Sequence, residues 1–103
     1  MTEQEFRIKA DEALESLERA LLPLADAEGF EVETQNGVLQ VIFEEPGAAK
    51  FIVSPNAPVK QIWLSAMSKS YKLSWDDASS VFALGGESLE ALVTRLATEF
   101  LAS

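Results

Sequence analysis

The sequence predicts an α+β fold: a two-layer sandwich in which two terminal helices cover one face of an antiparallel sheet of about five to six strands. Three observations indicate this architecture. Apolar residues recur at helical spacing at both ends of the chain, the segment between them alternates like strands, and an Asn-Gly pair joins two of those strands. Because antiparallel sheets commonly cover a core with one face only, we expect the other face to meet water.

The first helix is expected to begin at the start of the chain. Thr2, with Glu5 three residues later, matches a capping box. The apolar positions that follow at helical spacing are Phe6, Ala10, Ala13, Leu14, Leu17, Leu21 and Leu24. Because proline lacks the donor of a helical hydrogen bond, Pro23 is expected to end or kink the helix near Leu22, with residues 25–30 as the connection.

A hairpin is the strongest local signal in the chain. Residues 31–34 and 38–43 are predicted strands, and the Asn-Gly pair at residues 36–37 is the one preferred in type I′ turns. Pro46 and Gly47 then indicate a turn, after which residues 50–53 are predicted as a third strand.

The fourth predicted strand carries the most informative alternation. Two prolines predict a loop at residues 54–58, because each removes a backbone donor, and the strand is placed at 59–66. A period of two divides its side chains into Ile62, Leu64 and Ala66 on one face and Gln61, Trp63 and Ser65 on the other. We place the aliphatic set inside and Trp63 outside. A slip of one residue would reverse this and expose Ile62 and Leu64.

The chain is expected to close with two short strands and a helix. Residues 71–75 and 79–84 are the predicted strands, with Asp76 and Asp77 at the turn between them. After Gly85-Gly86, helical spacing links Leu89, Leu92, Val93, Leu96, Ala97 and Phe100. Residues 1–103 are therefore expected to form a single domain.

The composition excludes several classes of chemistry. The chain has no cysteine and no histidine, which removes disulfides, thiolate sites, imidazole-based triads and histidine-ligated zinc. A glycine-rich phosphate loop is also missing, and a domain of this size seldom offers the cleft that paired catalytic carboxylates need. We therefore expect no enzymatic activity. Because no apolar run resembles a secretory signal or a membrane span, a cytoplasmic protein is expected.

The charge is unevenly distributed along the chain. A formal net charge of −9 disfavours nucleic acid and anionic membranes and favours basic protein surfaces or cations. Residues 1–33 carry ten acids and three bases, whereas residues 46–75 hold no acid and four lysines: Lys50, Lys60, Lys69 and Lys72. The molecule is therefore expected to be electrically two-faced.

The acids of the first helix form the first candidate site. Asp11, Glu15 and Glu18 lie on a stripe roughly 120° from the centre of the apolar face, and Glu31 and Glu33 are expected beside it on the first strand. Clustered carboxylates are hard ligands that hold iron, manganese or calcium weakly. The alternative is an ordinary solvated helix face. The bases that would neutralise part of it are Arg7, Lys9 and Arg19.

The outer face of the sheet is the second candidate site. Gln61, Trp63 and Ser65 are predicted there, and an indole among polar neighbours is typical of an interface hot spot. Trp75 is expected to pack at an edge or to extend this patch. Asp76 and Asp77 are either a metal pair or turn residues.

Three stretches of the chain carry a family resemblance. They are Glu5-Phe6 with Ala10-Asp11, then Asn36-Gly37-Val38-Leu39, and, most specifically, Lys60-Gln61-Ile62-Trp63-Leu64-Ser65. Through them the chain resembles the frataxin family, to which the bacterial CyaY proteins belong. The likeness runs nearly end to end, and Gly86-Glu87-Ser88-Leu89 adds a weaker match.

The resemblance implies a frataxin-like sandwich that serves iron–sulfur cluster assembly. It implies weak binding of Fe²⁺ or Fe³⁺ by surface carboxylates and docking on a cysteine desulfurase and its scaffold protein. The acidic ridge of the family would here comprise Asp11, Glu15, Glu18, Glu31 and Glu33, and the residues facing the scaffold would be Gln61 and Trp63, with Ser65 beside them. We expect a monomer, with an iron-dependent oligomer as the alternative.

The chain also departs from the family pattern. Relatives place acids at the end of the first helix, where this chain has Leu21-Leu22-Pro23-Leu24, so its ridge is thinner. Ser54, Ser68-Lys69-Ser70 and Ser80 stand where the family often has an asparagine, a glycine-rich turn and a second tryptophan. Two other functions stay open: a small acidic secretion chaperone that dimerises without metal, and iron oxidation at surface carboxylates.

Overall fold

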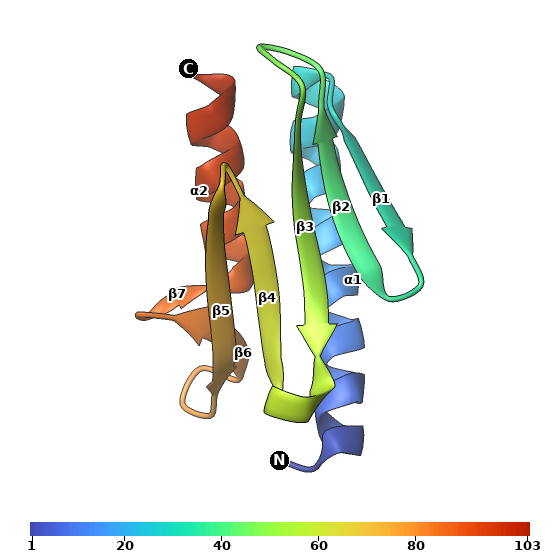
Figure 1. The fold of residues 1–103 in the computed structure, drawn as a ribbon, viewed down its shortest axis with the longest axis vertical. Coiled ribbons are helices and arrows are strands. Elements are labelled where there is room, and N and C mark those ends of the chain that lie inside the picture. The colour runs from blue at the N-terminus through green and yellow to red at the C-terminus, as the bar shows by residue number, and fades with distance from the viewer.

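The computed structural model describes residues 1–103 as two helices packed on one face of a seven-stranded antiparallel sheet (Figure 1). The strands follow one another in the order β1 to β7, and each pairs with the next. Figure 1 looks onto the open face, with both helices behind the sheet. The predicted α+β sandwich is confirmed, with seven strands in place of the expected five to six.

Helix α1 (Glu3–Glu28) begins as the sequence predicts. The Thr2 hydroxyl accepts a hydrogen bond from the backbone N–H of Glu5 at 3.0 Å, and the Glu5 carboxylate accepts one from the backbone N–H of Thr2 at 3.0 Å. This reciprocal pair is a capping box. The backbone hydrogen bond from Thr2 also lowers the pKa of the Glu5 carboxyl below its ordinary value.

The prediction that Pro23 ends α1 near Leu22 is wrong. Residues 25–28, expected in a connection, are helical, and α1 stops only at Gly29, whose φ of 82° is left-handed. A proline inside a helix costs about 3 kcal/mol. Leu21 and Ala25 are both buried on the core face, and burying a leucine side chain alone stabilises by about 2 kcal/mol, so tertiary packing offsets the local cost.

The first hairpin joins β1 (Glu31–Gln35) to β2 (Val38–Phe43). Asn36 and Gly37 have φ of 54° and 76°. Positive φ at both central residues is what a type I′ turn requires, and this turn matches the twist of the strands. The predicted hairpin is therefore confirmed.

Strand β3 (Ala49–Asn56) is longer than expected, because it includes residues 54–56 of the predicted loop. Strand β2 pairs with β3 only as far as Val53, so the end of β3 has β4 as its single partner. Proline is tolerated at such an edge position, which is where Pro55 lies. The chain turns through η1 (Ala57–Val59), and β4 (Gln61–Ala66) begins two residues later than expected.

The last strands lead directly into the second helix. Strands β5 (Lys69–Asp76) and β6 (Val81–Leu84) precede a two-residue strand, β7 (Glu87–Ser88), which the sequence analysis missed. Helix α2 (Leu89–Leu101) follows at once, capped by the Ser88 hydroxyl, which accepts from the backbone N–H of Ala91 at 3.1 Å.

One cluster of 22 buried residues fills the space between helices and sheet and contains no polar side chain. Phe43 of β2 contacts Phe51 of β3 and Phe100 of α2, with ring centroids 5.0 and 4.8 Å apart. Near the other end, Phe6 of α1 meets Phe82 of β6 edge-on at 5.6 Å. Aromatic pairs therefore join both helices to the sheet.

An arginine clasp ties β7 to α2. Arg95 donates two hydrogen bonds to the Glu87 carboxylate, at 2.8 and 2.9 Å, and a third to Glu99 at 3.2 Å. The hydrogen bonds from Arg95 lower the pKa of the Glu87 carboxyl below its ordinary value. The clasp therefore stabilises the fold most when Glu87 is ionised.

We predict that Pro23→Ala stabilises the protein. Alanine restores a backbone donor and removes the steric conflict with the preceding turn, so the free energy of unfolding should rise by about 2 kcal/mol in urea titration. Pro58→Ala is the matched control, because Pro58 lies at the start of η1, where no donor is needed. Equal gains in both variants would contradict the explanation.

We also predict that the clasp makes stability depend on acid pH. Because the folded-state pKa of Glu87 is lowered, its contribution is complete above the ordinary glutamate pKa of about 4.3 and disappears as pH falls through the folded value. Thermal unfolding should show that the wild type loses more stability than Arg95→Gln between about pH 7 and pH 3. Parallel curves of stability against pH for the two proteins would contradict a contribution of the clasp to this pH dependence.

Candidate partner-binding and metal-binding surfaces

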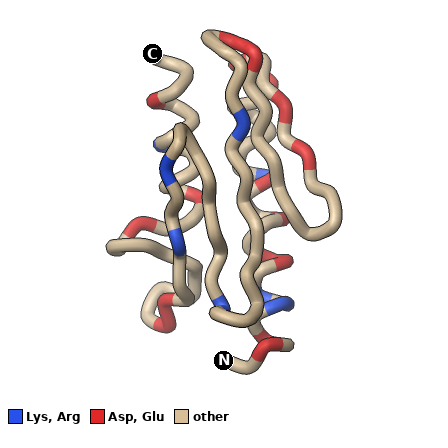
Figure 2. Tube along the Cα trace, viewed as in Figure 1, with Lys and Arg blue, Asp and Glu red and all other residues tan.

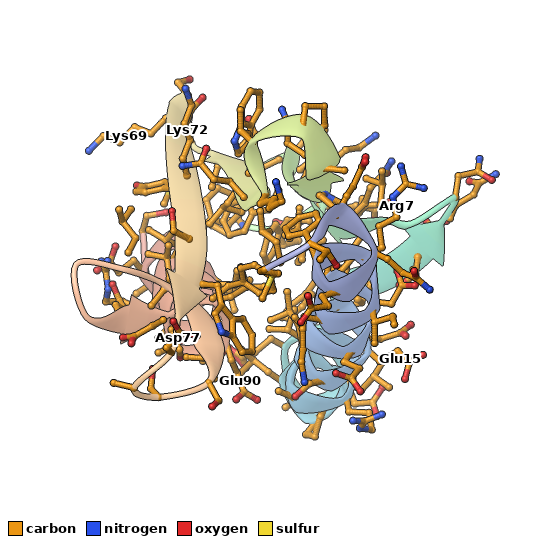
Figure 3. All side chains as sticks on the ribbon, turned by 90° about the horizontal axis from the view of Figure 1, so that it is seen from below. Arg7, Glu15, Lys69, Lys72, Asp77 and Glu90 are labelled. Atoms are coloured by element: carbon orange, nitrogen blue, oxygen red, sulfur yellow. The ribbon has the colours of Figure 1, made fainter.

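The acidic stripe of α1, formed by Asp11, Glu15 and Glu18, lies on the side of the helix that faces β1. Asp11 and Glu15 are exposed and Glu18 is half-buried. Helix α1 packs beside β1, and Figure 3 shows Glu15 on the opposite side of α1 from Asp77 and Glu90. The predicted stripe is therefore a real surface feature at one edge of the molecule.

None of the ridge carboxylates is neutralised within the chain. Arg7 pairs with Glu3 at 3.1 Å and Lys9 pairs with Glu12 at 3.7 Å, while Arg19 forms no ion pair. The three bases expected to neutralise part of the stripe therefore leave it unpaired. Its full negative charge is available to a basic surface or a cation.

The two acids of β1 occupy a different side of this edge. Val32 packs toward the core opposite Val41, so the alternation of the strand turns Glu31 and Glu33 to the open face. Figure 2 shows acids along both α1 and β1. The expected ridge is thus divided between the helix layer and the open face, and no group of three or more acidic side chains is arranged to hold a metal ion.

Trp63 lies on the open face, as the alternation of β4 predicts. Its side chain is 37% exposed, while Ile62, Leu64 and Ala66 are buried. The indole N–H donates to the Gln61 side-chain oxygen at 3.1 Å. The register that would have buried Trp63 is excluded.

Side chains of β4 and β5 hold this indole in place. The Gln61 amide donates to the Ser74 hydroxyl of β5 at 3.3 Å, and the Lys72 ammonium sits 4.8 Å from the centroid of the Trp63 ring. A cation over an indole face contributes about 0.5–1 kcal/mol at an exposed site. Trp63 is therefore presented in a fixed orientation, with less rotamer freedom to lose when a partner binds.

A shallow hollow of about 230 Å³ adjoins the indole. Ser65, the third predicted residue of this face, lines it together with Ile52 and Lys72, and Ile52 is 36% exposed. The sequence analysis missed Ile52, although the alternation of β3 around buried Phe51 and Val53 places it outside. Apolar surface thus extends from Trp63 on β4 to Ile52 on β3.

Trp75 packs on the opposite side of the sheet from Trp63. It is half-buried on the helix side of β5, meets Phe82 edge-on at 5.2 Å, and its indole N–H donates to Asp77 at 2.9 Å. The Asp76 carboxylate accepts the backbone N–H of Ala78 at 3.0 Å. Asp76 therefore stabilises the turn and Asp77 holds the indole. Of the two roles considered for this pair, these contacts match turn residues.

The middle of the sheet and the edge formed by α1 and β1 differ in charge. Figure 2 shows basic residues on β3, on β5 and just before β4, and acidic residues along α1 and β1. Of the four lysines between Pro46 and Trp75, Lys50 lies on β3, Lys69 and Lys72 lie on β5, and Lys60 lies between η1 and β4. The predicted uneven distribution of charge is therefore present in the fold. Neither helix combines the length and apolar character that a bilayer span requires.

The fold and these surfaces define a small α+β sandwich domain, with an acidic helical edge and an aromatic patch on the open sheet. The model of the frataxin-like domain matches residues 1–102, and the chain belongs to this family.

Similar proteins support the assignment along the chain. The chain is 31% identical over 96 residues to the iron-sulfur cluster assembly protein CyaY of Cupriavidus metallidurans, covering 91% of this chain and 85% of that one. It is 30% identical over 103 residues to the CyaY of Pseudomonas syringae pv. tomato, covering 96% and 88%. It is 38% identical over 73 residues to the CyaY of Janthinobacterium sp., but this match spans only 64% of that protein.

A solved structure shares the fold. The frataxin of Psychromonas ingrahamii superimposes with a TM-score of 0.65 at 18% sequence identity, covering 100% of this chain and 92% of that one. At this identity the likeness concerns the arrangement of helices and strands. It matches the two-helix, antiparallel-sheet architecture described above.

Proposed function

We propose that this protein is a non-catalytic, cytoplasmic factor of iron–sulfur cluster assembly. In this proposal it binds iron weakly through surface carboxylates and docks on the complex of a cysteine desulfurase and its scaffold protein. The observation that carries the proposal is the fixed, exposed Trp63 on the central strand of a domain whose separate helical edge keeps unpaired carboxylates. The names of the CyaY relatives supply the process.

The stripe of α1 is suited to a basic surface on the desulfurase. Its carboxylates are unpaired, so forming ion pairs with a partner sacrifices no internal ones. Complementary charge accelerates encounter and fixes orientation more than it adds affinity. Exposed pairs are screened by salt over about 8 Å at physiological ionic strength, so this contact should be salt-sensitive.

Trp63 is suited to anchor the scaffold contact. Tryptophan is among the residues that contribute most to interface affinity, and truncating such an anchor costs about 2 kcal/mol or more. The neighbouring Ile52 and the hollow beside it extend the apolar contact, and the polar ends of Gln61 and Ser74 form its rim. The open sheet therefore has the centre and the border of a binding patch.

Iron is the cargo of the proposed role. Asp11 and Glu15 are four residues apart and Glu15 and Glu18 three apart, so successive carboxylates lie on one helix face and two can approach one ion. Carboxylate oxygens suit Fe²⁺ and Fe³⁺, with water completing the coordination. Because no three acids converge, binding is weak and the ion is readily passed on.

We predict separate effects of the two surfaces on partner binding. In pull-down and calorimetric titration with desulfurase and scaffold, Glu15→Lys/Glu18→Lys should weaken desulfurase binding by about tenfold or more, with a loss of salt sensitivity. Trp63→Ala should weaken the scaffold contact by about 2 kcal/mol. The matched control is Glu12→Lys/Glu90→Lys, which makes the same charge change on the other side of α1 and on α2 and should retain desulfurase binding.

The proposal fails if neither variant loses a partner. Equal losses in the control pair would mean that net charge, rather than the stripe, governs binding. Dimerisation that rises with protein concentration, without any effect of iron, would instead favour the metal-free chaperone.

We predict that the stripe carboxylates contribute most of the iron affinity. In anaerobic calorimetric titration with Fe²⁺, Glu15→Gln/Glu18→Gln should lower the affinity severalfold, because each substitution removes a hard ligand, whereas Glu12→Gln/Glu90→Gln should leave it unchanged. In air, neither protein should turn over Fe²⁺ catalytically. Repeated turnover that disappears in the stripe variant would favour the ferroxidase alternative.

A further inference from the structure

An apolar groove, separate from the hollow beside Trp63, lies on the helix side of the molecule, away from the open sheet and from the acidic stripe. A hollow of about 280 Å³ separates α1 from the β5–β6 hairpin and the start of α2. Phe82 and Leu89 lie beneath it, and small side chains at Ala13, Ser16 and Ser80 border it and leave it open.

Trp75 joins this hollow to a second one. A neighbouring space of about 300 Å³ is lined by Met1 and Ile8, and both hollows share Lys9 and Trp75. Ile8 is 52% exposed although it lies on a helix with a large core face. The two hollows adjoin each other along α1 at Lys9 and Trp75, and together they make up the groove. They provide more apolar surface than isolated exposed residues do.

The rim of this groove is acidic. Glu12 and Glu90 border the first hollow and Glu5 and Asp77 the second, against Lys9 as the single base. Figure 3 shows Asp77 and Glu90 on the same side of α1, opposite Glu15. Glu90 also lies in the first turn of α2 and, with the Ser88 cap, offsets the positive end of that helix.

The groove already accommodates one cation. The Lys9 ammonium lies 5.7 Å from the Trp75 ring centroid and 3.7 Å from the Glu12 carboxylate. An indole face together with carboxylates is a favourable environment for a lysine or arginine side chain. A ligand with several positive charges would satisfy Glu5, Asp77 and Glu90, which have no cationic partner in the chain.

We propose that this groove binds a short basic segment of a partner protein, with one apolar side chain in the hollow above Phe82 and Leu89 and flanking lysines or arginines paired with Glu12 and Glu90. The segment recognises an apolar slot with an acidic rim, which the stripe and the open sheet do not offer. This binding is independent of the role proposed above, because it uses the other side of α1.

The two tryptophans allow a direct test. Trp63→Phe leaves Trp75, in the groove wall, as the only indole. The probe is an acetylated and amidated lysine–lysine–leucine–lysine–lysine peptide, which has no aromatic residue. Its binding should shift the emission of Trp75 to shorter wavelength, whereas Trp75→Phe, which reports on Trp63, should show no shift.

Two groove variants in the Trp63→Phe background test the location. Ser16→Tyr places a large side chain in the hollow, and Glu12→Lys/Glu90→Lys reverses the rim. Each variant should lower the affinity for the peptide by about tenfold or more. The Glu15→Lys/Glu18→Lys variant should bind the peptide with unchanged affinity, because the acidic stripe faces β1 and not the groove. Since Glu12 and Glu90 are exposed, their variant keeps the test decisive if Ser16→Tyr unfolds.

Three results would overturn the inference. They are the absence of a Trp75 shift, an equal shift with a peptide in which glutamine replaces leucine, and unchanged affinity in the rim variant. A variant that loses desulfurase binding but keeps peptide binding, or one that loses peptide binding but keeps desulfurase binding, would show that the groove is distinct from the proposed docking surfaces.

Discussion

The alternation of β4 is the constraint on which the rest of the molecule depends. Ile62, Leu64 and Ala66 belong to the buried cluster, and β4 has a paired strand on each side. Because side chains alternate along a strand, burial of these three residues sends Gln61, Trp63 and Ser65 to water. The exposed indole is therefore a consequence of core packing, and its position is as fixed as the core itself.

The two helices divide the remaining surface into regions of different chemistry. One side of α1 carries unpaired carboxylates beside β1, and the other borders the groove that contains Trp75. The lysines of β3 and β5 lie on the sheet. A domain without histidine or cysteine thus presents three distinct surfaces with carboxylates, ammonium groups and indoles alone.

Much of this arrangement could be predicted from local sequence. The capping box at Thr2, the Asn-Gly hairpin and the outward Trp63 each depend on neighbouring residues only, and the structure confirms all three. The wrong predictions occur where packing between residues far apart in the sequence determines the local structure. Pro23 remains helical because the residues around it are buried, and Pro55 remains in a strand because β2 ends before it.

The candidate site was predictable to a similar degree. Residue spacing located the stripe on α1, but the outward turn of Glu31 and Glu33 depends on the pairing of Val32 with Val41. The Lys72–Trp63 and Arg95–Glu87 contacts join residues whose proximity only the strand register and the packing of α2 establish. Periodicity assigns a side chain to a face, whereas its neighbours on that face come from tertiary structure.

The ends of the sheet have a consequence for how the protein behaves at high concentration. An unpaired edge strand is a template for strand addition, which leads to polymers and amyloid-like aggregates. Here β7 is only two residues long, and β1 carries Glu31 and Glu33 at its border. Repulsion between these carboxylates on neighbouring molecules opposes edge-to-edge joining, so a protein with an uncovered sheet face is protected from self-assembly at both borders.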